Sequence, residues 1–136
     1  MAQRGLQFFP AVLPVRAGST VVFPNEDEIF HNVFSYSPTR TFDLGRYTPD
    51  ETPPVRDFPN PGVVRLFCEV HSHMRATILV LDTPWFTATD EEGEYRIAEV
   101  PPGEYTVVAW VTERIQLRKN VRLSAGEVLR IDWNPE

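Results

Sequence analysis

The chain has 136 residues, enough for one substantial domain, or for one domain with a small annex. Its formal net charge of −6 argues against non-specific binding to nucleic acid. No stretch approaches the ~18 consecutive apolar residues of a membrane span. No charged start with a following apolar run is present either, so we expect any signal peptide to have been removed.

Short runs of β-forming residues recur along the chain, and turn residues separate them. Thirteen prolines and seven glycines interrupt the sequence, and no long stretch repeats apolar residues at helical spacing. Prolines in residues 46–57 indicate an extended loop there rather than a helix. The pattern predicts an all-β sandwich or barrel. In chain order, the predicted strands are residues 19–23, 63–67, 76–81, 94–100, 104–111, 120–126 and 127–133.

The segment "FCEVHSHM", residues 67–74, holds the single cysteine of the chain, two of its three histidines and one of its two methionines. Alternation along the preceding strand places Cys68 on the same, inward face as Leu66. His71 and Met74 follow in the turn before the next strand. The ordinary interpretation is a buried thiol with polar neighbours. Met74, however, lies among polar residues, where we expect no packing role for an apolar thioether.

His31 follows an acidic turn far upstream and is the candidate for a further ligand. Taken alone, it also fits an ordinary exposed histidine. Together with Cys68, His71 and Met74 it makes two imidazoles, one thiolate and one thioether. This set suits copper much better than magnesium or calcium, and it is the composition of a trigonal blue-copper site with a weak axial methionine.

Two segments in the same order resemble the copper-binding segments of cupredoxins, the plastocyanin and amicyanin type of protein. They are "VRAGSTVVFPNEDEIFHNVFS" and "PGVVRLFCEVHSHMRATILVLD". The resemblance implies a Greek-key β-sandwich that binds one copper ion per chain, alternating between Cu(I) and Cu(II). It implies His31, Cys68, His71 and Met74 as the ligands. Asn32 would tie the two ligand loops together and help to hold the Cys68 sulfur.

His73 has no counterpart in the resembling loop. It could serve as an alternative axial ligand, as a surface group that modulates access, or as neither. Because the spacing is already complete with Met74, we interpret His73 as a non-ligand.

The C-terminal third, "PWFTATDEEGEYRIAEVPPGEYTVVAW", resembles carboxypeptidase-regulatory-like modules of the transthyretin type. We therefore predict a cupredoxin domain over residues 1–83 and a partial β module over residues 84–136. About fifty residues form only a small core, so the module would leave a β edge through which copies of the chain could associate. An acidic cluster in it fits a charged hairpin turn better than a calcium site. Its members are Asp90, Glu91, Glu92 and Glu94.

With three histidines in total, the chain cannot assemble the second copper centre that nitrite reductases and multicopper oxidases need. The sequence therefore predicts an electron carrier rather than an enzyme. The resemblance implies a periplasmic or otherwise extracytoplasmic location, and a redox partner such as a c-type cytochrome or a periplasmic oxidoreductase. Pro14 and Phe34 are candidates for an apolar collar around His71. Two alternatives remain: storage or delivery of copper, and a metal-free β-sandwich scaffold.

Overall fold

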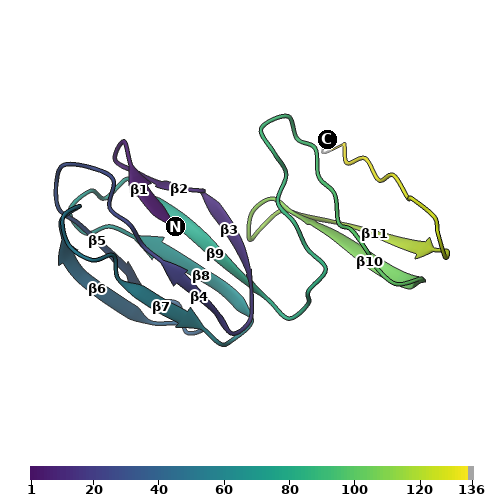
Figure 1. Cartoon of the computed structure of the whole chain (residues 1–136), viewed down its shortest axis with the longest axis horizontal. Coiled ribbons are helices and arrows are strands. Elements are labelled where there is room, and N and C mark those ends of the chain that lie inside the picture. The colour runs from purple at the N-terminus through teal and green to yellow at the C-terminus, as the bar shows by residue number, and fades with distance from the viewer. Residues whose placement is uncertain (135–136) are drawn as a thin grey trace. The chain divides into compact units, whose positions relative to one another are not determined.

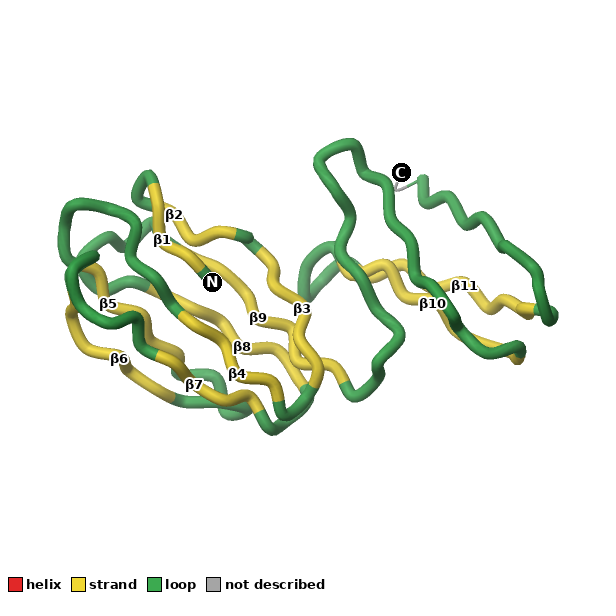
Figure 2. Tube along the Cα trace, viewed as in Figure 1, coloured by secondary structure: helices red, strands yellow, loops and turns green. Residues whose placement is uncertain are grey.

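The computed structural model describes residues 1–134. The chain divides into two compact units, Met1–Tyr95 and Arg96–Glu136. These residues contain no helix, and therefore none that could cross a membrane. The all-β prediction is confirmed (Figures 1 and 2). The strands of the first unit are β1 (Ala2–Arg4), β2 (Gln7–Phe9), β3 (Val12–Arg16), β4 (Ser19–Val22), β5 (His31–Ser35), β6 (Phe42–Tyr47), β7 (Val55–Phe58), β8 (Gly62–Phe67) and β9 (Arg75–Leu81).

The first unit is built around a five-stranded sheet in the order β3-β9-β8-β5-β6. Strands β3 and β9 are parallel, and the other neighbours are antiparallel. The antiparallel pair β4–β7 forms a separate layer, and side chains from both layers share one core. Three phenylalanines illustrate this packing. The rings of Phe23 and Phe58 each contact the ring of Phe42 in β6, with a centroid separation of 5.9 Å in both pairs. The core therefore fills the space between the two layers of a β-sandwich.

A bulge in β5 changes which side chains face the core. The pairing of β5 with β6 shifts in register between Asn32 and Phe34. In a regular strand, successive side chains point to opposite faces. Here His31, Asn32 and Val33 are all buried. Bulges can redirect side chains, and this one follows Asn32 in the middle of β5, next to the predicted site.

A two-residue turn joins β1 and β2. Arg4 pairs with Gln7, and the intervening Gly5 and Leu6 both have a φ of 58°. Two positive φ values are typical of a type I′ hairpin turn. A side chain in the left-handed region costs about 1–2 kcal/mol, so Leu6 needs compensating contacts.

The second unit contains one antiparallel hairpin, of β10 (Gly103–Trp110) and β11 (Gln116–Leu123). The predictions of strands at residues 94–100 and 127–133 are wrong, because neither segment is a strand in the structure. Both segments have the composition of a strand, but a strand also needs a neighbour to complete its hydrogen bonds. The other five predicted strands coincide with β4, β8, β9, β10 and part of β11.

Tyr47, the last residue of β6, is buried, and its hydroxyl lies 2.8 Å from the Phe23 carbonyl oxygen and 2.9 Å from Gln3 Oε1. Burial raises the pKa of Tyr47 to about 12, so the phenol is neutral at ordinary pH. The Tyr47 hydroxyl has one proton, and both buried oxygens share this hydroxyl as a hydrogen-bond donor.

We expect Tyr47→Phe to lower the free energy of unfolding by about 1–3 kcal/mol, because buried polar groups lose their partner. Chemical denaturation of the metal-free protein measures this change. Tyr36→Phe is the matched control, since Tyr36 is 75% exposed and its loss should cost less than about 0.5 kcal/mol. Equal effects of the two substitutions would contradict the interpretation.

Candidate metal centre

His31 begins β5, and its imidazole is fully buried. Its Nε2 lies 2.7 Å from a carboxylate oxygen of Asp27. A carboxylate accepts hydrogen bonds, so Nε2 carries the proton. The unprotonated Nδ1 then faces the Cys68 sulfur at 3.7 Å. The Asp27 contact thus leaves the lone pair of His31 available toward Cys68.

Cys68 directly follows β8 and is 2% exposed, as strand alternation predicts. The loop after it turns back so that His71 Nδ1 lies 4.0 Å from the sulfur. The Met74 amide closes this turn by donating to the His71 carbonyl at 3.0 Å. The Met74 side chain is 1% exposed and belongs to the hydrophobic core. Our expectation that its thioether has no packing role is therefore wrong, because the core accounts for its burial.

Three donor atoms converge at this point: one nitrogen of His31, the sulfur of Cys68 and one nitrogen of His71 lie within 4.8 Å of one another. Two ligands that share an ion at bond lengths near 2.0–2.3 Å lie roughly 3.5 Å apart. The observed separations of 3.7 and 4.0 Å from the sulfur need only a small contraction. The N, N, S donor set fits a soft transition-metal ion.

His71 differs from His31 in its exposure, since its ring is only partly buried. Desolvation, followed by the charges of His31 and His73, lowers the pKa of the His71 imidazole, and Asp27 acts in the opposite direction. A lowered pKa favours the neutral imidazole, which is the form that binds a metal. The His31 and His71 rings meet edge to face with centroids 5.0 Å apart.

Asn32 joins the two segments that carry these donors. Its Oδ1 accepts a hydrogen bond from the Glu69 amide at 2.8 Å and lies 3.7 Å from the Cys68 sulfur. Because Asn32 follows His31 and Glu69 follows Cys68, one side chain links the starts of both segments. The hydrogen bond from the Glu69 amide to the Asn32 side chain is a link of the kind that we predicted between the two ligand loops.

His73 points away from this group. Its Nε2 donates to the Leu6 carbonyl oxygen at 2.9 Å, and its ring is exposed. The ring lies beside His71, with centroids 6.2 Å apart. His73 is not among the three converging donors, although its role at a metal site stays a prediction.

Sequence reasoning missed Asp27. This carboxylate accepts from His31 and from the amides of Gly5 and Leu6, at 2.7, 2.7 and 3.0 Å. Burial acts to raise its pKa, but the hydrogen bonds from His31, Leu6 and Gly5 and the electrostatic interaction with His31 together lower it. The carboxylate therefore stays ionised. The available signal was the position of an aspartate four residues before a candidate ligand.

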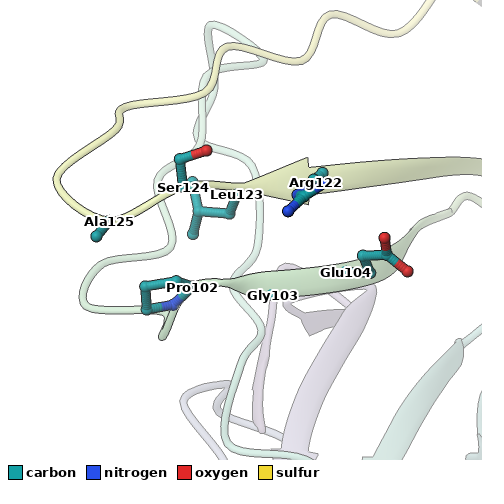
Figure 3. A pocket seen from close by; sticks show the side chains of 7 residues that line it. All are labelled: Pro102, Gly103, Glu104, Arg122, Leu123, Ser124 and Ala125. Carbon is teal, nitrogen blue, oxygen red and sulfur yellow. The ribbon is translucent and has the colours of Figure 1, made fainter.

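Neither of two other features resembles a cofactor site. Asp90, Glu92 and Glu94 lie close together but are exposed, and the Asp90 carboxylate accepts from the amides of the other two, as in the predicted charged turn. Figure 3 shows an open depression at one end of the β10–β11 hairpin. Pro102 and Leu123 are among the residues that line it, and no histidine or cysteine is.

Comparisons with known proteins bear on both parts of the chain. Residues 73–134 match the sequence model of the Carboxypeptidase regulatory-like domain. This confirms the predicted resemblance of the C-terminal segment. The match begins earlier than we predicted, so β9, a strand of the five-stranded sheet, also falls within it. The comparison with curated proteins found no match.

Solved structures resemble the chain over about three-fifths of its length. A reduced amicyanin variant matches with a TM-score of 0.53 and 19% identity, over 59% of this chain and 78% of that one. Another amicyanin variant, also reduced, matches with a TM-score of 0.53 and 22% identity. A Cu-containing nitrite reductase from Thermus scotoductus SA-01 has a TM-score of 0.56 and 25% identity, covering 60% of this chain but 22% of the reductase.

The chain contains a cupredoxin fold. In this fold, the converging donors come from the start of β5 and from the loop between β8 and β9. The predicted boundary between residues 83 and 84 stays a prediction.

We expect Asn32→Ala to lower the free energy of unfolding of the metal-free protein by about 1–3 kcal/mol, because the Glu69 amide loses its acceptor. Chemical denaturation measures the change. Asn60→Ala is the control, since Asn60 is exposed and makes only a 3.4 Å contact with the Thr39 carbonyl. A loss no larger than that of the control would show that the tie contributes nothing.

Proposed function

We propose that the protein is a mononuclear type 1 copper protein that carries electrons. The observation that carries the proposal is the convergence of His31 Nδ1, the Cys68 sulfur and His71 Nδ1, with Met74 buried three residues after His71. We assign these four residues as ligands of one copper ion. Bound there, copper would accept and release one electron by alternating between Cu(II) and Cu(I).

The protein contributes rigidity and exclusion of water. Cys68 and His31 are buried, which shields the thiolate bond and keeps solvent from entering as a ligand. The ligands are held by strand ends, by the Asn32 tie and by the Asp27 contact. Donor atoms held in one geometry need little rearrangement when the charge of the ion changes, which is the requirement for fast electron transfer.

His71 is the route for the electron in this proposal, because it is the more exposed of the two imidazoles. Apolar side chains lie next to the donors in the chain: Ile29 and Phe30 precede His31, and Val70 precedes His71. They are 44%, 55% and 41% exposed, respectively. These three join Pro14 and Phe34 as our candidates for the docking collar. A small apolar surface suits a transient redox complex.

We place the protein outside the cytoplasm, in the bacterial periplasm, and propose a c-type cytochrome or a periplasmic oxidoreductase as its partner. Electron transfer is favoured over catalysis because the three histidines of the chain leave only His73 beyond the proposed ligands. One histidine cannot build the second centre that reduction of a substrate such as nitrite requires. Association of copies through the C-terminal module stays a prediction.

The first test adds one equivalent of Cu(II) to the metal-free protein and records visible and EPR spectra. We expect an intense blue thiolate-to-copper band with narrow hyperfine splitting. Cys68→Ala should abolish this band, whereas the control His73→Ala should retain it.

Two other outcomes would favour the alternatives. A colourless complex whose copper passes readily to a chelator would favour storage or delivery of the metal. Absence of copper binding would overturn the proposal and leave a β-sandwich scaffold.

Net charge predicts how the partner approaches. With a formal charge of −6, the protein should attract a cytochrome that has a basic face. We expect stopped-flow electron transfer with such a cytochrome to slow about tenfold or more as ionic strength rises from ~0.01 to ~0.2 M. A cytochrome with an acidic face is the control and should show the opposite trend. Rates that do not depend on salt would exclude electrostatic steering.

A further inference from the structure

We propose that the Gly5–Leu6 turn is a brace between the two segments that carry the copper ligands, with Asp27 and His73 as its anchors. The inference rests on the proposed function in so far as those ligands bind copper. The two anchors are positioning residues: each acts on the site through a contact with the turn.

Asp27 anchors the turn to the upstream segment. One carboxylate oxygen accepts from the Gly5 amide at 2.7 Å, and the other accepts from the Leu6 amide at 3.0 Å and from His31 Nε2 at 2.7 Å. The Asp27 amide donates to Asn25 Oδ1 at 2.9 Å, which fixes the residue that holds the carboxylate. The orientation of the His31 ring is thereby coupled to the position of the turn.

His73 anchors the turn to the downstream segment. It lies between His71 and Met74, and its Nε2 donates to the Leu6 carbonyl at 2.9 Å. This contact joins residues 67 positions apart in the chain. The loop between Cys68 and Met74 is therefore held near both of its ends, at Glu69 by the Asn32 tie and at His73 by the turn.

The turn itself shows that these contacts are specific. Leu6 adopts a φ of 58°, a conformation that suits glycine and asparagine much better than leucine. A type I′ turn usually leaves its outward polar groups to water. Here the amides of Gly5 and Leu6 and the carbonyl of Leu6 all bond to side chains of the two ligand segments. The hydrogen bonds therefore restrain the turn and also restrain Asp27 and His73.

The consequence for the site is resistance to opening. Release of copper requires the two segments to separate, and the brace opposes that separation from the side of β1 and β2. The carboxylate on His31 adds an electrostatic effect, because its negative charge favours Cu(II) over Cu(I). Loss of the charge should raise the reduction potential.

The test begins with the metal-free protein. Hydrogen exchange of the Gly5 and Leu6 amides, followed by NMR, reports whether the turn is held. We expect Asp27→Asn to speed the exchange of at least one amide by tenfold or more. An asparagine side chain has one acceptor oxygen, so it cannot replace both carboxylate oxygens that accept hydrogen bonds from the Gly5 and Leu6 amides. His73→Ala should speed it as well, and His73→Gln should restore protection, because glutamine can donate to the Leu6 carbonyl. Glu28→Gln is the control: it removes the carboxylate of the next residue, which is exposed.

The copper-loaded protein gives the second readout. We expect Asp27→Asn and His73→Ala to lose copper to a chelator 10–100 times faster than the wild type. Asp27→Asn should also raise the reduction potential, by about 59 mV for each tenfold change in the relative affinity for the two oxidation states. Glu28→Gln and His73→Gln should stay close to the wild type in the rate of copper loss. Circular dichroism confirms that each variant is folded.

The outcomes separate the two proposals. If the wild type shows the blue band but Asp27→Asn and His73→Ala behave like Glu28→Gln, the brace is wrong and the copper assignment stands. If the wild type shows no blue band but the variants still lose amide protection, the brace exists as a structural contact and the proposed function fails. If His73→Ala alone has no effect, the downstream anchor is refuted.

Discussion

The hydrogen bond between Asp27 and His31 is the contact on which the site depends. A fully buried imidazole needs a partner for its N–H group, and the carboxylate supplies one at 2.7 Å. The same contact determines which ring nitrogen is free, and that nitrogen faces Cys68. Asp27 stays ionised because it also accepts two backbone hydrogen bonds. One carboxylate thus fixes the tautomer, the ring orientation and the local charge.

The five-stranded sheet then brings residues that are distant in the chain close to this contact. His31 and Cys68 are 37 positions apart in the chain, yet β5 and β8 are neighbours, with Phe34 opposite Phe67. His31 and Asn32 are both buried, and both pair with β6 before the register shift in β5. Asn32 can therefore bond to the backbone beyond Cys68 while His31 presents its ring nitrogen to the sulfur. Rigid strand ends place the donors, and a short loop supplies the more exposed one.

The C-terminal part of the chain is limited by how little apolar surface it buries. Its family match begins at residue 73 and includes β9, which is hydrogen-bonded on both sides within the five-stranded sheet. The second unit retains one hairpin, and several of its apolar side chains are exposed. Among them are Val108, Val111, Ile115 and Val128. A two-stranded sheet buries little apolar surface by itself, which is consistent with the exposure of these side chains.

The sequence by itself determined the all-β class, the inward face of Cys68 and the grouping of candidate donors around it. These follow from local properties: alternation along a strand, turn residues between strands, and the rarity of cysteine and histidine in this chain. Only the tertiary structure decided the rest. It buried Met74 in the core, turned His73 toward Leu6 and brought Asp27 to His31. Segments 94–100 and 127–133 have a strand-like composition but do not form strands. The His73 contact joins residues 67 positions apart, and core packing buries Met74, so the pattern of neighbouring residues encodes neither. Asp27 is only four residues before His31, but the conformation of the intervening loop decides whether their side chains meet.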